Sequence, residues 1–147
     1  MKKLLVSSGV MLLGIVTLSS PASAAQIISS GGSCADIQGG GTADGTPMII
    51  FHCHGSPNQN WVLTNGTITG AAGTCLDIMG SAPNDGAQII VVQCNGRASQ
   101  KWQVTQGQIV GLGGKCLDIQ GGGGDDRTPL VLKTCNGGSA TQQWSIQ

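Results

Sequence analysis

The sequence predicts an all-β domain built from three repeats with a period of about 41 residues, each containing four short strands. The motif Cys-x-Asp-Ile occurs three times, and its cysteines are evenly spaced at Cys34, Cys75 and Cys116. Each repeat then ends with Gln-x-Trp. The chain also has 25 Gly, no Glu and no Tyr. This composition disfavours a helical bundle, because glycine weakens helices and a strong helix former is missing.

The charge content excludes further classes of protein. Charged residues make up 10% of the 147 residues, with only seven Lys and Arg in total. So few basic residues cannot form the positively charged patch of a nucleic-acid-binding protein. The low charge also argues against a disordered chain.

The N-terminal residues are typical of a secretory signal peptide. Lys2 and Lys3 precede an apolar stretch over residues 4–18, and Ala22-Ser23-Ala24 offers a cleavage site. A transmembrane anchor is the alternative, but it needs about 20 apolar residues. We therefore expect a signal peptide over residues 1–24, a mature domain over residues 25–147, a secreted protein and no membrane span.

The six cysteines indicate disulfides, because the chain is predicted to be exported. Six cysteines allow 15 pairings, but the two cysteines of each repeat are separated by the same interval, and this spacing selects one bond within each repeat. The predicted bonds are Cys34–Cys53, Cys75–Cys94 and Cys116–Cys135. A metal site is the alternative, but no Cys-x-x-Cys spacing occurs, so we expect no metal and no cofactor.

The repeats extend over about residues 26–65, 66–106 and 107–147. The mature chain has 18 Ile and Val against six Leu, which favours strands. Asn65-Gly66 and Asp85-Gly86 are typical of hairpin turns. Another Asp follows the first by eight residues in every repeat, at Asp44, Asp85 and Asp126. The strands expected in the second repeat are about Thr67–Gly70, Thr74–Ile78, Ala87–Gln93 and Lys101–Thr105.

Three such units favour a closed barrel with threefold symmetry, which leaves no exposed strand edges. A propeller has blades of similar length but needs at least four of them. The tryptophans recur once per repeat, so we expect them to pack in a shared core rather than at a binding surface. The predicted core residues are Trp61, Trp102, Trp144, Ile37, Ile78 and Ile119.

The three Cys-x-Asp openings with three Gln-x-Trp endings resemble the ricin B-type lectin family, and are similar to family 13 carbohydrate-binding modules. The resemblance covers about residues 26–147 and implies a β-trefoil with pseudo-threefold symmetry. It also implies one potential sugar site per repeat. In that site an Asp accepts hydrogen bonds from sugar hydroxyls, an aromatic ring stacks on the sugar, and an Asn precedes the Gln-x-Trp motif.

The first repeat keeps most of this set. Asp36 is the carboxylate, Phe51 stands at the aromatic position, and Asn58 precedes Gln59. His54 offers a further polar group. These five residues are the predicted carbohydrate site.

The other repeats keep the Asp but lack its partners. Ring and amide positions hold Val92 and Ser99 in the second repeat, and Lys133 and Thr141 in the third. Ile49 in the first repeat also replaces a Gln that often helps in the family. We treat Asp77 and Asp118 as weaker candidates, since an Asp retained without its partners is explained by a structural role.

Two classes of function remain after catalysis is set aside. Most Asp residues are triplicated and no Gly-x-Ser-x-Gly motif occurs, so no catalytic residues are expected. The first class is a secreted lectin with at most one well-formed site, for galactose-like or xylan-type glycans by resemblance. The second is a β-trefoil that has lost sugar binding and acts through protein contacts, as a toxin accessory subunit, an inhibitor or a surface-interaction module. Either could act beside a separately encoded protein partner.

Overall fold

The computed structural model describes residues 8–16 and 23–147. Short strands and single 3₁₀ turns make up the regular structure of these residues. The strands are β1 (Ile27–Ser29), β2 (Cys34–Ile37), β3 (Thr46–Phe51), β4 (Val62–Thr64), β5 (Thr67–Thr69), β6 (Thr74–Ile78), β7 (Ile89–Gln93), β8 (Gln103–Thr105), β9 (Gln108–Val110), β10 (Cys116–Ile119), β11 (Leu130–Lys133) and β12 (Trp144–Ile146). The 3₁₀ turns are η1 (Gln38–Gly40), η2 (Pro57–Gln59), η3 (Ala71–Gly73), η4 (Met79–Ser81), η5 (Ala98–Gln100), η6 (Leu112–Gly114), η7 (Gln120–Gly122) and η8 (Ala140–Gln142).

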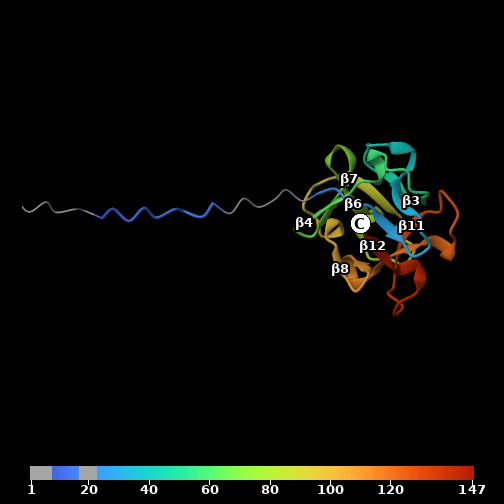
Figure 1. Cartoon of the computed structure of the whole chain (residues 1–147). Coiled ribbons are helices and arrows are strands. Elements are labelled where there is room, and N and C mark those ends of the chain that lie inside the picture. Colours follow the sequence, from blue (N-terminus) through green and yellow to red (C-terminus); the bar gives the residue numbers. More distant parts are fainter. Residues whose placement is uncertain (1–7, 17–22) are drawn as a thin grey trace, which may run out of the picture.

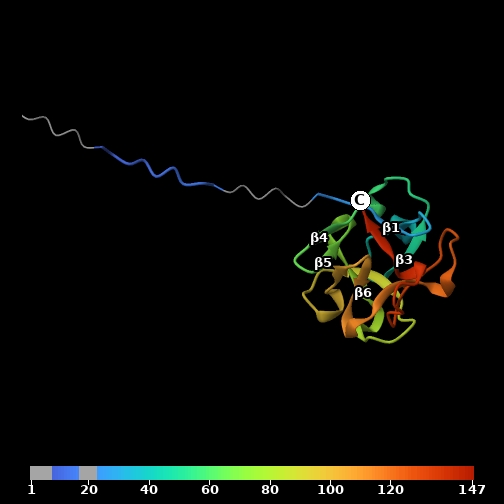
Figure 2. The same ribbon diagram turned by 60° about the horizontal axis from the view of Figure 1, so that its bottom comes forward.

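The strands form two sets of three antiparallel pairs, so the fold is a β-trefoil with pseudo-threefold symmetry (Figure 1). In one set β4 pairs with β5, β8 pairs with β9, and β12 pairs with β1, which brings the last strand beside the first. The other set is β2–β3, β6–β7 and β10–β11. These three hairpins contact one another in a ring, through the pairs Thr46↔Val91, Gln88↔Val131 and Ile49↔Pro129. Figure 2 shows the strands around the central axis from a second direction.

The strands expected in the second repeat are confirmed as β5 to β8, with ends within two residues of the prediction. The Asn65-Gly66 turn is confirmed as well. It joins β4 to β5, and both residues have positive φ, 52° and 80°, as a tight two-residue hairpin turn requires.

The prediction of a hairpin turn at Asp85-Gly86 is wrong. Strands β6 and β7 do pair, but η4 and a longer loop separate them. Asp85 is not among the residues with positive φ, and its carboxylate accepts a hydrogen bond from Thr134 N–H in the third repeat. A contact between repeats therefore explains this Asp better than local turn chemistry.

The three tryptophans lie in the hydrophobic core, together with Ile37, Ile78 and Ile119, as expected. Each indole N–H donates to a backbone carbonyl two residues before one of these isoleucines, at Ala35, Leu76 and Leu117. The rings lie against the backbone so closely that a Cβ added at Gly70 would come within 2.6 Å of Trp61 Cζ3, and one at Gly111 equally close to Trp102 Cζ3.

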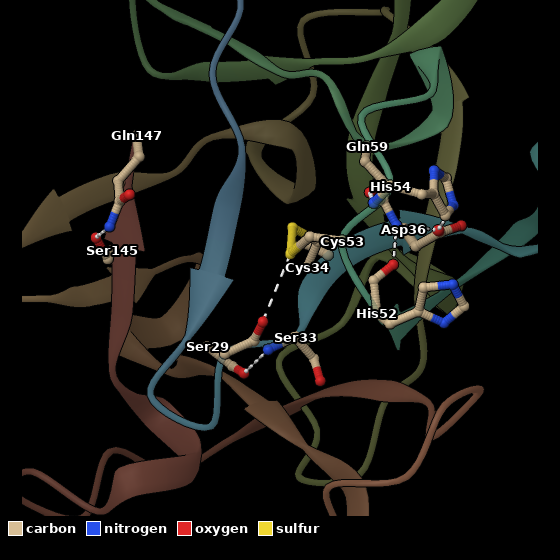
Figure 3. The surroundings of a disulfide bond; sticks show 12 residues. Ser29, Ser33, Cys34, Asp36, His52, Cys53, His54, Gln59, Ser145 and Gln147 are labelled. Atoms are coloured by element: carbon tan, nitrogen blue, oxygen red, sulfur yellow. Dashed lines mark hydrogen bonds and ion pairs between the residues drawn. A yellow bond between two sulfur atoms is a disulfide. The ribbon is translucent and has the colours of Figure 1, made fainter.

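All three predicted disulfides are present, each with a sequence separation of 19. The Cys34–Cys53 bond lies beside the side chains of Asp36, Gln59, His52 and His54 (Figure 3). It joins the start of β2 to the segment just after β3 and so fixes the strand that carries Asp36 against the segment that carries both histidines.

Part of the predicted signal peptide, residues 1–7 and 17–22, lies outside the described residues. Residues 8–16 form neither helix nor strand and are exposed. Within the described ranges, no helix is long and apolar enough to cross a membrane.

Candidate functional site

Each repeat holds its first Asp in the same way, through the Gln of the Gln-x-Trp motif. The Gln Nε2 donates to one Asp carboxylate oxygen at 2.7–2.9 Å. It also donates to a backbone carbonyl just before the second cysteine of the repeat. The Gln Oε1 accepts from the backbone N–H just after that cysteine. The pairs are Asp36–Gln59, Asp77–Gln100 and Asp118–Gln142.

This arrangement changes what is expected of Gln59. Its side chain is fully buried, and its amide oxygen and nitrogen already bond within the protein. A ligand cannot reach it directly, so the structure differs here from the expectation that Gln59 contacts a sugar. Gln59 instead orients Asp36 and the backbone on both sides of Cys53.

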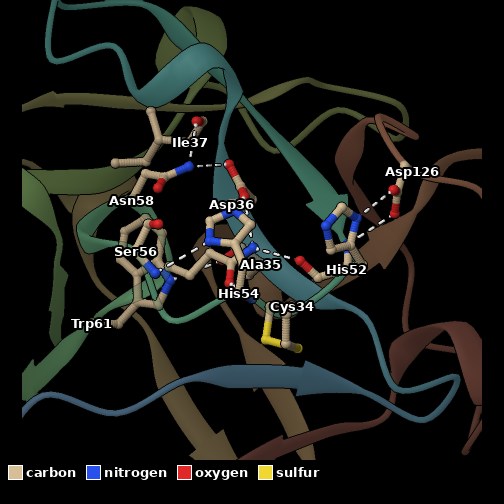
Figure 4. Close-up of polar contacts among 12 residues, drawn as sticks. Cys34, Ala35, Asp36, Ile37, His52, His54, Ser56, Asn58, Trp61 and Asp126 are labelled. Atoms are coloured by element: carbon tan, nitrogen blue, oxygen red, sulfur yellow. Dashed lines mark hydrogen bonds and ion pairs between the residues drawn. A yellow bond between two sulfur atoms is a disulfide. The ribbon is translucent and has the colours of Figure 1, made fainter.

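The second carboxylate oxygen of the Asp separates the first repeat from the others. Asp77 Oδ1 and Asp118 Oδ1 accept from the backbone N–H of the following isoleucine, at 2.6 and 2.7 Å. Asp36 Oδ1 accepts instead from Asn58 Nδ2 at 2.7 Å (Figure 4). In the first repeat the carboxylate is therefore turned toward another side chain, and in the second and third it is satisfied by its own strand.

His54 adds a third donor beside Asp36. Ser56 N–H donates to His54 Nδ1 at 3.1 Å, so in the neutral imidazole the proton is on Nε2. Nε2 lies 3.3 Å from Asp36 Oδ2. Asn95 and Asn136 take the place of His54 after the second cysteine of the other repeats, and they also accept a backbone N–H. Only the imidazole has a second nitrogen that reaches the Asp.

Phe51 supplies an aromatic platform next to Asp36, at a position where the other repeats have no ring. It lies at the end of β3, half-buried, opposite Cys34 in the strand register. Its ring centroid is 4.3 Å from that of His52 and 5.7 Å from that of His54. Phe51 therefore forms an aromatic cluster with the two imidazoles.

The second triplicated Asp connects each repeat to its neighbour. Its carboxylate accepts from a backbone N–H at the end of the third strand of another repeat, at 2.7–2.8 Å. The bonds are Asp44 to Gln93, Asp85 to Thr134 and Asp126 to His52. In the last of these, His52 Nδ1 also lies 2.7 Å from Asp126 Oδ2, which joins the third repeat to the first (Figure 4). The sequence pattern pointed to these residues without indicating the pairing.

Two of these carboxyls have shifted pKa values. Hydrogen bonding by His52 is the main cause that lowers the pKa of Asp126 below its ordinary value. Hydrogen bonds from Lys115 and Thr134 lower the pKa of Asp85. Both carboxylates are exposed, so water and salt weaken these contacts.

Arg127 occupies a position that is glycine in the other repeats. Gly45 and Gly86 follow the second Asp with φ of 90° and 85°, and Arg127 follows Asp126 with φ of 72°. Each of the three donates its N–H to a carbonyl in the neighbouring repeat. A residue with a Cβ pays roughly 1–2 kcal/mol for this backbone conformation. The arginine Cζ lies 6.0 Å from the Phe51 ring centroid.

These side chains surround a shallow pocket of about 230 Å³, hereafter the first-repeat pocket. Of the five predicted site residues, it brings together Asp36, Phe51, His54 and Asn58 and leaves Gln59 behind them. It also includes residues that sequence reasoning missed. These additional residues are Gln38, Gly39, Gly40 and Arg127, and the pocket is also lined by Ile49, which stands in place of the Gln that often helps in the family. The replacement of glycine by Arg127 after a repeated Asp was the signal in the sequence that could have found it.

The corresponding position in the third repeat is a pocket of about 260 Å³, hereafter the third-repeat pocket. Lys133 stands where the first repeat has Phe51, and Gly86 where it has Arg127. Asp118 does not line this pocket. The weaker candidates Asp77 and Asp118 are both buried and bonded to their own strand, which supports a structural role for them.

Comparison with known proteins gives the same fold and a family. The model of the ricin-type β-trefoil lectin domain matches residues 23–144. A designed threefold-symmetric protein, ThreeFoil, has a TM-score of 0.77 and 25% identity, over 84% of this chain and 96% of that one. A non-toxic homologue of type II ribosome-inactivating proteins from Momordica charantia (bitter gourd), solved in complex with α-methyl-D-galactoside, has a TM-score of 0.74 and 28% identity, over 86% of this chain and 48% of that one.

Two further likenesses are more limited. The C-terminal half of an earthworm R-type lectin, solved in complex with GalNAc, is 21% identical with a TM-score of 0.72, over 85% of this chain and 98% of that one. A probable lipoprotein of Salmonella typhimurium, EnvE, is 42% identical over 43 residues, which are 29% of this chain. The match spans about a quarter of that relative's length.

Proposed function

This chain belongs to the ricin-type β-trefoil lectin family, and on that premise we propose that it binds a saccharide through one site, the first-repeat pocket. One observation carries the proposal. The positions at which this site departs from the threefold pattern gather at a single pocket. They are Phe51 for Val92 and Lys133, His54 for Asn95 and Asn136, and Asn58 for Ser99 and Thr141.

The chemistry of the pocket suits a sugar. Asp36 is buried, and its Oδ1 accepts one short hydrogen bond, from Asn58, so a spare lone pair remains there to accept a hydroxyl. Asn58 is half-buried, and its side-chain carbonyl can accept another. The half-buried Phe51 ring supplies an apolar surface for the C–H face of a pyranose. Binding, and not catalysis, is the activity we propose.

The expected ligands are galactose-like or xylan-type glycans. The bitter gourd homologue holds a methyl galactoside and is 28% identical to this chain, which supports the first class. A single open site with one phenyl ring is expected to bind at about millimolar Kd, or roughly −4 kcal/mol. Such a site gains strength mainly from several copies acting together on a polyvalent glycan.

We also propose that the chain is exported after cleavage near Ala24. The three disulfides support this location, because such bonds persist in oxidising compartments. Mass spectrometry of the protein from the medium or the cell envelope tests the proposal. A mature N-terminus at Ala25 is expected, and an intact Met1 in the exported protein would contradict it.

A glycan array followed by titration calorimetry tests the binding proposal. The wild type is expected to bind galactosides or xylo-oligosaccharides with one site per chain. Phe51→Ala should abolish this binding with the disulfides intact. Val92→Ala removes the side chain at the matching position of the second repeat and should leave binding unchanged.

Two results would contradict the proposal. If the wild type binds no glycan on the array, the proposed lectin function is wrong. The alternative, a β-trefoil that acts through protein contacts, is then favoured. If Phe51→Ala binds as well as Val92→Ala does, the chain is a lectin but its site lies elsewhere.

A further inference from the structure

Arg127 is the feature of the first-repeat pocket that sugar binding of the kind proposed above does not require. Hydroxyl recognition needs the carboxylate, the amide and the ring, and all three come from the first repeat. Arg127 comes from the third repeat, in the loop between η7 and β11. The guanidinium lines the pocket next to Phe51.

The Arg127 side chain is free to meet a ligand. Among residues 8–16 and 23–147, no hydrogen bond or ion pair to its guanidinium is present, although Asp125 and Asp126 are its neighbours in the chain. Asp126 accepts its hydrogen bonds from the backbone and ring of His52, and Arg127 adds only a smaller Coulombic attraction that helps to lower the pKa of Asp126. The guanidinium carbon lies 6.0 Å from the centroid of the Phe51 ring, whose face attracts a cation but uses none of the five N–H donors of the arginine.

The backbone makes an accidental arginine a poor explanation. The other two repeats use glycine at this turn, where φ is positive in all three. A Cβ here is strained whatever the space around it. The fold disfavours a side chain at this position, yet Arg127 lies at the pocket that keeps the sugar-binding set. This indicates that contact with a ligand offsets the backbone cost.

The charged side chains of the first-repeat pocket indicate which chemical group the ligand carries. Asp36 and Arg127 are the charged side chains that line the pocket, with His54 as a titratable neighbour. Asp36 is surrounded by donors from Asn58, Gln59 and His54, whereas the Arg127 guanidinium has no acceptor among the described residues. The planar guanidinium fits a carboxylate or sulfate with two parallel hydrogen bonds.

From this geometry we propose that the first-repeat pocket selects an anionic saccharide. A sugar hydroxyl meets Asp36 and Asn58, the ring lies on Phe51, and a carboxylate or sulfate group on the same glycan pairs with Arg127. This inference rests on the proposed sugar site and adds the substrate class. Uronic acid residues and sulfate esters are the two sources of such a group.

Calorimetry or ligand-observed NMR with galactose, galacturonic acid and galactose 6-sulfate tests the inference. The wild type should bind at least one of the anionic sugars about tenfold more tightly than galactose at about 0.01 M salt, and the preference should shrink at about 1 M salt, because the ion pair is exposed. The same comparison with a xylo-oligosaccharide and its glucuronic acid-substituted form covers the other glycan class. The sugar that shows the preference identifies carboxylate or sulfate as the source.

Three variants isolate the role of the arginine. Arg127→Gln removes the charge and should reduce the preference to less than about twofold, through weaker binding of the anionic sugar. Arg127→Gly restores the residue of the other repeats, so it should fold normally and lose the preference too. Arg97→Gln removes the other arginine of the chain, which lies outside the pocket, and should keep the wild-type preference.

The inference and the proposed function fail differently. Equal binding of neutral and anionic sugars by the wild type overturns the inference and leaves the lectin function standing. So does a preference that survives in Arg127→Gln, or tighter galactose binding by Arg127→Gly, which would mean that the arginine covers the ring. Binding of no saccharide overturns both.

Discussion

The first-repeat and third-repeat pockets share one frame and differ in chemistry. Each is lined by a hairpin of one repeat, β2–β3 or β10–β11, and by the loop of another repeat that carries its second Asp. A Gln-Gly pair lines each pocket as well. The first presents an Asp, a phenyl ring, an imidazole, an amide and a guanidinium. The third presents Lys133 and Gly86 in place of Phe51 and Arg127, and its Asp118 is withdrawn into the strand.

The comparison shows that the repeated Asp has two separable functions. One oxygen accepts from the buried Gln in all three repeats and holds the hairpin to the Gln-x-Trp segment. The other oxygen accepts from a side chain only in the first repeat, where Asn58 donates to it, and accepts from the backbone of its own strand in the other two repeats. The residues repeated within the chain therefore indicate which contacts hold the fold together. The unrepeated residues beside them indicate the candidate binding site.

Removing one disulfide at a time should give the largest effect and separate frame from site. Each bond closes a loop of the same length, so replacing either Cys34 and Cys53 or Cys75 and Cys94 by Ala should cost roughly 3 kcal/mol of unfolding free energy. Urea unfolding measures the loss. Of these two bonds, only Cys34–Cys53 lies beside Asp36 and His54 (Figure 3). Only the variant without this bond should therefore also lose glycan binding. Equal binding by the two variants would mean that the frame of the first repeat does not hold the site.

The buried glutamines should behave alike across the repeats. Gln59→Ala, Gln100→Ala and Gln142→Ala each remove the Gln donor from one oxygen of a buried carboxylate and the Gln partner from two backbone groups, at about 2–3 kcal/mol of unfolding free energy. Chemical denaturation of the three variants measures it. A much smaller cost for Gln59→Ala would show that His54 and Asn58 hold Asp36 without it.

Transplanting the unrepeated residues should create a second site. The triple variant Lys133→Phe, Asn136→His and Thr141→Asn gives the third repeat the ring, imidazole and amide of the first. The introduced amide should draw Asp118 Oδ1 away from Ile119 N–H, as Asn58 does for Asp36. Calorimetry should then count two sites per chain, both about millimolar. The single variant Lys133→Phe is the control, and we expect it to keep one site.

Acid should weaken the contacts between repeats by the smallest amount. The lowered pKa values of Asp126 and Asp85 mean that their stabilising contribution is complete above the unfolded pKa of about 3.9 and is lost as the pH falls through the folded value. The double variant Asp85→Asn and Asp126→Asn should therefore lose less stability than the wild type between about pH 5 and pH 2. Urea unfolding across this range measures it, and parallel curves would assign the acid sensitivity to other carboxyls.

Four side chains that line the first-repeat pocket could be predicted because they lie close in the sequence. Asp36, Phe51, His54 and Asn58 belong to one hairpin and the turn after it, and the strand register places Phe51 two residues beyond the partner of Asp36. Comparison of the three repeats with one another showed at which positions the first repeat differs from the other two. The Asp85-Gly86 turn was misjudged because the same dipeptide suits a hairpin and a contact between repeats.

The sequence by itself determined the threefold frame, which comprises the period, the disulfide pairing and the tryptophan core, and it showed that Phe51, His54 and Asn58 occur in the first repeat alone. These are properties of contacts within one repeat, and the chain spells them out three times. The tertiary structure alone decided which oxygen of Asp36 accepts from Asn58, that Gln59 is buried behind it, that Asp126 bonds to His52, and that Arg127 of the third repeat lines a pocket formed mainly by the first. The physical reason is the ring of hairpins, which sets the loop of the third repeat beside the first and makes each pocket the product of two repeats.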